Sequence, residues 1–483
     1  MSEGGTENRE KGFFSLLIDF VKYLFIDEKG QIVLMLFIVA GLIAFMSAFS
    51  EPIVAMVGSP IIPITLSEEG RIARIIMMYH SIAIPFLAAV VLLVLTQYDL
   101  RPNFKGYVRW PLFIGTLLTV IGGISFAYIF FENWIMHGLF LVGLSLVFYS
   151  GVTLIVGIFP TRKFPSIEKN PESPYLGGIN LEYFDMMLAG LCLLISAIMG
   201  AIPGAHFGNG FEAILAEDIV RLEHGLFERM IISHLHAMVA LLAAVILVLV
   251  FRYSKFSGKV YKAALVLTII GVVVLSIGDW LVAPGWEKAH VVINVGATFL
   301  MVVSVMLAIL GWIRTSKLVL GSEYQFATIG QKIAAVFKDP VKFGLYFEFL
   351  WVLFSVMIPG VYVALNLETF RSEAYTEIER VFNAGHWHVL ATLMAIMVML
   401  LVIDYFGAEG KIRQLLGWML TIGSILAFGF AQVYMIRTPE IDTSWAIIPI
   451  DIGVAMMVIA VGIYCIYLIV SYFKQSSAIK WHK

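Results

Sequence analysis

The chain has 483 residues, of which 60% are hydrophobic and 14% are charged, and its mean hydropathy is +0.91. Soluble domains are about half apolar and about a quarter charged, so this composition excludes an ordinary soluble domain and indicates a polytopic membrane protein. The formal net charge of -2 gives no reason to expect a nucleic-acid partner.

The first 30 residues precede the membrane domain. Residues 1–11 are polar, and 13–26 mix Phe, Leu and Ile with charged residues, which predicts an amphipathic helix in the membrane interface. Runs of about 20 or more apolar residues then follow to residue 473, and residues 474–483 form a short tail. The runs predict an all-α membrane protein with twelve transmembrane helices, at about 31–50, 74–97, 109–131, 134–159, 181–202, 228–252, 261–283, 288–313, 343–365, 381–403, 412–436 and 446–473.

Charge predicts the orientation of these helices. The first segment, the loops after even-numbered helices and the tail together hold 24 of the 32 Lys and Arg residues. Because positively charged loops stay on the cytoplasmic side, we expect a multi-pass protein of the cell membrane with both termini in the cytoplasm.

The membrane domain, 31–473, contains an internal repeat of about 150 residues. The fifth predicted helix begins LEYFD at Leu181–Asp185, and the ninth contains LYFE at Leu345–Glu348. The sixth begins ERMIISHLH at Glu228–His236, and the tenth begins ERVFNAGHWH at Glu379–His388. These matches predict three pseudo-symmetric four-helix arcs, about 31–160, 179–313 and 342–473.

Histidines gather at one depth of the predicted bundle. Residues two apart on a helix point about 200° from each other, so His386 and His388 present an imidazole to each side of one helix. In the expected topology the intramembrane histidines all lie near the starts of even-numbered helices, close to the outer face; they are His80, His137, His234, His236, His290, His386 and His388. Titratable groups in membrane helices are expensive, and a shared depth favours cofactor ligands over scattered hydrogen bonding. Imidazole is a common ligand of haem iron and of copper.

Histidines on the second, sixth and tenth helices, with His-x-His on the tenth, are similar to those of subunit I of the heme-copper oxidase and nitric oxide reductase superfamily. The resemblance implies that His80 and His388 hold a low-spin haem and that His386 is the proximal ligand of a second haem. It further implies that His234 or His236 faces the second haem. The repeat favours His236.

The sequence also departs from that family. The outer end of the seventh helix reads SIGDW at Ser276–Trp280, where the family has two adjacent histidines that bind copper. This difference argues against copper. The two cysteines, Cys192 and Cys465, lie in apolar runs, so there is no attachment motif for c-type haem, and two or more b-type haems are expected.

Four arginines are candidates for binding haem propionates. Arg74, Arg229 and Arg380 lie one or two turns outward of the histidines, and Arg437 resembles a propionate-binding position of the family. Two carboxylic acids, Asp185 and Glu348, fall near inner helix ends, where the interface would solvate them.

We therefore expect a haem-binding redox protein that passes electrons near the outer membrane face. Its partners would be a quinone or quinol, or a cytochrome-like or cupredoxin-like electron carrier, together with the lipid bilayer and accessory subunits. Two alternatives remain open. One is a terminal oxygen or nitric oxide reductase with a non-standard metal site that uses His290 and Asp279. The other is a non-redox transporter with a histidine proton relay.

Overall fold

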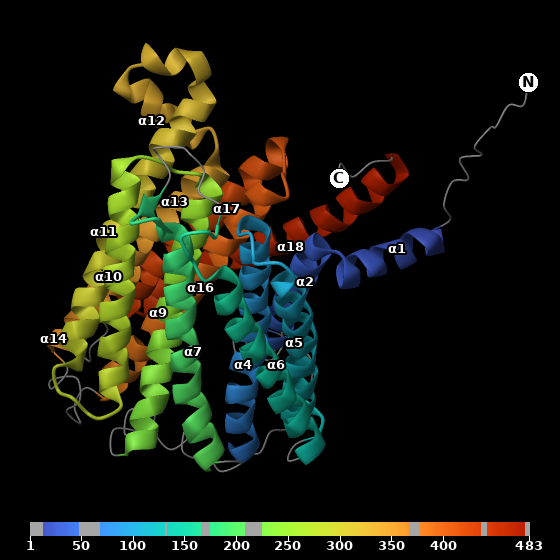
Figure 1. The fold of residues 1–483 in the computed structure, drawn as a ribbon, viewed down its shortest axis with the longest axis vertical. Coiled ribbons are helices and arrows are strands. Elements are labelled where there is room, and N and C mark those ends of the chain that lie inside the picture. The colour runs from blue at the N-terminus through green and yellow to red at the C-terminus, as the bar shows by residue number, and fades with distance from the viewer. Residues whose placement is uncertain are drawn as a thin grey trace, which may run out of the picture.

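A computed structural model describes residues 13–47, 68–130, 133–165, 174–207, 225–366, 376–435 and 442–478 (Figure 1). Over these residues the chain is almost entirely helical, with one antiparallel hairpin of strands β1 (Tyr175–Leu176) and β2 (Ile179–Asn180). The long helices are α1 (Phe13–Ile26), α2 (Glu28–Ser47), α4 (Glu68–Gln97), α5 (Phe104–Tyr128), α6 (Trp134–Ile158), α7 (Leu181–Phe207), α9 (Leu226–Ser254), α10 (Lys259–Val282), α11 (Ala289–Leu320), α13 (Pro340–Val352), α16 (Thr376–Tyr405), α17 (Gly410–Met435) and α18 (Ile447–Ala478).

Shorter elements join some of these helices. A 3-10 turn, η2 (Gly321–Gln325), and the short helix α12 (Ile329–Phe337) connect α11 to α13, and η5 (Ser444–Ala446) precedes α18. A π-helical turn, η3 (Leu353–Met357), joins α13 to α14 (Ile358–Leu365) without a break, so these three form one long helix. The π-turn changes the rotational phase between the two halves of this helix.

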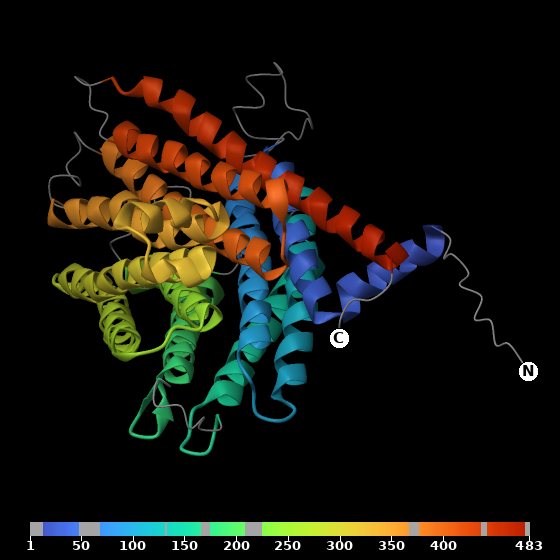
Figure 2. The same ribbon diagram turned by 90° about the horizontal axis from the view of Figure 1, so that it is seen from above.

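Eleven helical segments of the described chain are long and apolar enough to cross a membrane. This finding supports the expected all-α membrane protein with many spans. The first expected span, 31–50, corresponds to α2, which is not among the eleven, so the count of twelve stays a prediction. Helix α1 has the predicted bounds and packs on the end of α18, where the rings of Phe20 and Tyr472 are 4.9 Å apart (Figure 2).

Three helices, α4, α9 and α16, occupy the centre of the bundle. The runs Leu92–Leu95, Val245–Phe251 and Met397–Ile403 are buried on every side of their helices. A helix buried all around must be enclosed by other helices. The three run in the same direction, and α9 contacts both α4 and α16. They begin at the end that we call the histidine end and finish at the end that carries α12 (Figure 1), which we call the α12 end.

Polar contacts at the α12 end link helices that are two apart in the chain. In three places an acidic residue at the start of one long helix contacts a residue in the first turn of another long helix. One long helix separates the two along the chain in each case. The pairs are Glu28 with Lys105 at 2.7 Å, Glu182 with Tyr261 at 2.5 Å, and Asp339 with Arg413 at 2.8 Å. The two residues of each pair lie at a similar separation along the chain.

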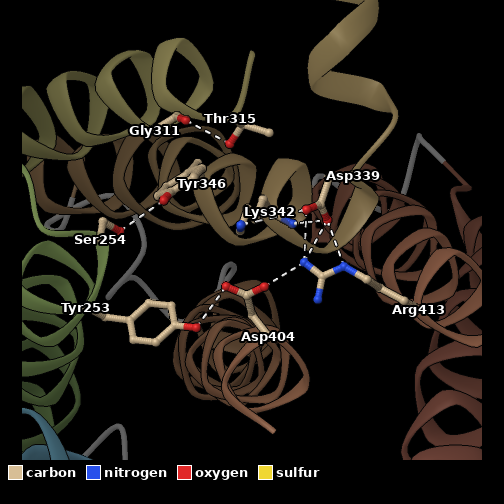
Figure 3. A network of polar contacts seen from close by, with 9 residues as sticks. All are labelled: Tyr253, Ser254, Gly311, Thr315, Asp339, Lys342, Tyr346, Asp404 and Arg413. Carbon is tan, nitrogen blue, oxygen red and sulfur yellow. Dashed lines mark hydrogen bonds and ion pairs between the residues drawn. The ribbon is translucent and has the colours of Figure 1, made fainter. Parts of the chain in front are cut away.

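The third of these contacts belongs to a larger network (Figure 3). The guanidinium of Arg413 donates to both carboxylate oxygens of Asp339, at 2.8 and 3.0 Å, and to Asp404 at 2.6 Å. The other oxygen of Asp404 accepts a hydrogen bond from the Tyr253 hydroxyl at 2.9 Å. The network thus joins α9, α16 and α17 to the residue that caps α13.

Replacing Arg413 by Ala should lower the free energy of unfolding by about 2–3 kcal/mol, because two largely buried carboxylates lose their partner. The more exposed pair is worth less, so Lys105→Ala should cost under about 1 kcal/mol. Unfolding in detergent, followed by circular dichroism, measures both, and the exposed Lys411 on the same turn of α17 provides a matched Ala control. Equal effects of all three substitutions would contradict this ranking.

Candidate functional site

The histidines of α9 and α16 meet at the histidine end. His236 interacts electrostatically with His386 of α16 and with His290 of α11. His236 and His386 were expected to face each other; the two rings lie within electrostatic range, and their pairing stays a prediction. His290, which the sequence placed with the other histidines near the outer face, also lies within electrostatic range of His236.

On its other side α9 presents His234 to α7. The Nδ1–H of His234 donates a hydrogen bond to the backbone carbonyl of Ser196 at 2.8 Å. The imidazole packs so closely on Gly200 that an added Cβ there would lie 2.6 Å from Nδ1. His80 of α4 lies within electrostatic range of the His234 ring.

His386 of α16 packs on α14 in a similar way to His234 of α9 on α7. Its ring lies against Gly360, where a Cβ would be 2.7 Å from Cε1, and the nearby backbone carbonyl belongs to Val356, four residues earlier. The same spacing of four separates Ser196 from Gly200. The Nδ1 atom of His386 is buried and makes no hydrogen bond of normal geometry.

The other histidine of α16 turns toward α4. His388 forms a hydrogen bond between its Nε2 and the hydroxyl of Tyr79 at 2.8 Å, and the two rings are tilted with centroids 6.0 Å apart. His80, the next residue, packs edge-on against Phe140 of α6 instead. Among the described residues, Tyr79 and His388 thus form a contact between α4 and α16, and the expected pairing of His80 with His388 stays a prediction.

These surroundings suit imidazoles that bind iron. A ligating histidine usually donates its second ring N–H to a carbonyl or carboxylate, which fixes the tautomer and leaves the other nitrogen as the ligand. The hydrogen bond from His234 to Ser196 fixes the tautomer in this way, because Nδ1 carries the hydrogen and Nε2 keeps its lone pair for a ligand. Haem iron takes only one or two axial imidazoles from the protein. Among the described residues, no three His, Cys, Asp or Glu side chains lie close enough together to hold a single metal ion.

The candidate propionate partners are only partly described. Arg229 donates from Nε to the carbonyl oxygen of Ala283 at 2.9 Å and lies beside Gly285, so it is tied to the turn after α10. Arg74 and Arg380 lie within α4 and α16, but their side chains are outside the described part of the structure. Arg437 lies outside the described residues.

Three acidic side chains are buried in the bundle. Asp185 and Glu348 are 1% and 0% exposed, so the expectation that the interface solvates them was wrong for both. Helices packed around them at the α12 end cover positions that hydropathy alone places near a boundary. Asp279, at the histidine end of α10, is 1% exposed, and its carboxylate oxygens make no hydrogen bonds.

Sequence reasoning missed several residues that shape the site. Tyr79 and Ser196 supply hydrogen-bonding partners, and Gly200 and Gly360 give the imidazole rings room. The Trp280 indole N–H, within the unusual SIGDW segment, donates to the Ser196 hydroxyl at 3.0 Å. The only sequence signal for any of these residues was that Tyr79 directly precedes the candidate ligand His80.

Comparison with protein-family models, with curated proteins and with solved structures finds no match for this chain.

Substituting Gly200 by Ala should destabilise the protein by about 1–3 kcal/mol, because the new methyl group overlaps the His234 ring and the packed helices cannot move apart freely. Gly204, one turn later on α7, faces open space, and a Cβ added there would have no neighbouring atom within 4 Å. Gly204→Ala should therefore be neutral or stabilising by up to about 1 kcal/mol. Thermal unfolding of the two variants in one detergent compares them, and equal loss of stability would refute the close-packing argument.

Proposed function

We propose that this chain is an integral membrane haem protein that passes electrons through two or more b-type haems at its histidine end. The single observation that carries the proposal is the matching placement of two imidazoles from central helices at one end of an apolar bundle, with His234 packed on Gly200 and His386 packed on Gly360. It agrees with the resemblance to subunit I of the heme-copper oxidase and nitric oxide reductase superfamily.

In this proposal His236 and His386 hold one haem between α9 and α16. When bound, the haem supplies a one-electron carrier, and iron with two imidazole ligands has no open position for a substrate. The protein residues would hold and orient the haem ligands. Gly360 lets the His386 ring lie close against α14, and the surrounding side chains exclude water from it. Arg229, with Arg74, Arg380 and Arg437, is assigned to the haem propionates.

The proposed architecture is twelve transmembrane helices in three four-helix units. It is supported by the three similar contacts at the α12 end and by the equivalent surroundings of His234 and His386. Both termini and the α12 end would face the cytoplasm. The histidine end would then exchange electrons with a quinol pool or with a cytochrome-like or cupredoxin-like carrier, in the cell membrane and with accessory subunits.

One observation favours a second candidate function. His290 reaches the same group as His236 and His386, so three imidazoles gather where two suffice for a closed haem. A terminal reductase of oxygen or nitric oxide would use His386 as the only axial ligand and would need an open iron position facing His236 and His290.

Purified protein should contain at least about two haems per chain, by extraction and by reduced-minus-oxidised spectra, and less than about one copper. His386→Ala and His236→Ala should each remove the same haem signal, because the two side chains share one iron. His137→Ala is the control, since His137 packs against Phe126 away from this group. If the purified protein is folded but contains no haem, the haem proposal is wrong and the non-redox transporter remains as the alternative.

Carbon monoxide distinguishes the closed site from the open one. The reduced wild-type protein should not bind the gas, because both axial positions are filled, and binding should appear in His236→Ala. Binding by the wild type that the substitution leaves unchanged would instead favour the reductase.

A further inference from the structure

Two carboxylic acids, Asp185 of α7 and Glu348 of α13, are buried inside the bundle near its α12 end. Each directly follows the dipeptide Tyr-Phe, so the two occupy equivalent positions in the internal repeat. Both carboxylate oxygens of Asp185 lack a hydrogen-bond partner. At Glu348 the Ser424 hydroxyl donates to Oε2 at 2.8 Å, and Oε1 has no partner. Because an apolar interior strongly disfavours a charge with so few partners, it favours the neutral acid at both positions.

The nearest arginine does not change this balance. One turn before Asp185, on the same face of α7, Glu182 accepts hydrogen bonds from Arg252 at 2.8 Å and from the Tyr261 hydroxyl at 2.5 Å. Since Arg252 already has Glu182 as its partner, its charge is balanced and does not replace the water that an ionised Asp185 would need. Within the described chain no charged side chain lies in electrostatic range of Glu348.

A second buried polar group, the hydroxyl of Tyr98, lies in the same cluster as Asp185. The Tyr98 ring contacts the Tyr183 ring with centroids 5.0 Å apart, and the Arg252 guanidinium lies 5.6 Å from the Tyr98 centroid. The Tyr98 hydroxyl has no hydrogen-bond partner and is within electrostatic range of Asp185. The Arg252 side chain is 34% exposed, so the cluster reaches water at the α12 end. Of the described residues, the titratable and charged groups presented to Asp185 from α7, the end of α4, α9 and α10 are Glu182, Tyr183, Tyr98, Arg252 and Tyr261.

We propose that Asp185 and Glu348 are proton-binding sites of the membrane domain, and that Asp185 exchanges its proton with water at the α12 end through the Tyr98 hydroxyl. Each site holds its proton as a neutral carboxylic acid. On release, the Asp185 proton passes to the Tyr98 oxygen while the Tyr98 hydroxyl gives its own proton to water, and a carboxylate is left; uptake reverses these steps. The sites go beyond the proposed haem function, because neither acid is a candidate haem ligand and neither site requires a haem.

Stability alone does not explain these acids. An apolar side chain of similar size would pack at either position without the cost of burying a carboxyl group, yet both repeats carry an acid. An ionisable residue inside a membrane domain points to a function. A metal cation fits less well, because calcium or magnesium takes about six oxygen ligands. The described residues contain no group of three His, Cys, Asp or Glu side chains that could hold one.

Infrared difference spectra of the purified full-length protein test the proposal. The C=O stretch of a neutral carboxylic acid is separate from the bands of ionised carboxylates, and it shifts when the O–H becomes O–D. At neutral pH, Asp185→Asn should lose one such band and Glu348→Gln should lose another. Asp404→Asn is the control and should lose neither, because Arg413 holds Asp404 as an ion at 2.6 Å. If both variants keep every neutral-acid band of the wild type, the two acids are ionised and the proposal is wrong.

Deuterium exchange tests the route to Asp185. In D2O the Asp185 band should shift, and Tyr98→Phe should slow this shift by about tenfold or more, because a positioned hydroxyl speeds proton transfer. The Glu348 band is the internal control and should be unaffected by Tyr98→Phe. Equal rates in the wild type and Tyr98→Phe would overturn the route. If sodium ions remove the bands at constant pH, the sites bind a metal cation and the proposal is wrong.

Thermal unfolding gives a second readout that needs no assignment of bands. Asparagine has the shape of a neutral aspartic acid, so Asp185→Asn should unfold at nearly the wild-type temperature. Asp404→Asn should unfold at a lower temperature, because Arg413 loses a partner. An equal fall in both variants, or failure of Asp185→Asn to fold, would mean that Asp185 is held as an ion and would overturn the proposal.

Discussion

The bundle interior sets the main physical constraint on this protein, because an imidazole there must find a polar partner or lose the stabilisation that water would give it. The structure meets this constraint at His234 with a backbone carbonyl of α7. The carbonyl of Ser196 is already used within its helix, and its second lone pair accepts the ring N–H. Close approach is possible because Gly200 has no side chain. The positions of the rings, and any chemistry at them, depend on these contacts.

The two ends of the bundle have different roles in this arrangement. At the α12 end, ion pairs and hydrogen bonds join helices two apart in the chain, with the strongest network around Arg413. Because these contacts hold the helices where α4, α9 and α16 finish, they limit how the same helices can shift at the histidine end. Asp185 and Glu348, buried in equivalent positions near the α12 end, belong to the same repeated pattern.

Some features were predictable because they depend on local composition. Apolar runs located nearly all the long helices, and α1 has the predicted bounds. The histidine segments were correctly placed near the beginnings of α9 and α16. Other features were not predictable in the same way. The π-turn at Leu353–Met357 has no hydropathy signal, yet it sets which face of α14 meets His386.

The sequence by itself determined that this is a helical membrane protein with imidazoles gathered at one depth, because hydropathy and helical spacing act along the chain. It could not decide which histidines meet, because that depends on the rotation of each helix about its axis. A rotation of about 100° exchanges Tyr79 for His80 as the neighbour of His388. The tertiary structure decided this through the packing of Phe140 on His80 and of Gly200 on His234. These contacts join helices that are distant in the chain, and no local pattern specifies them.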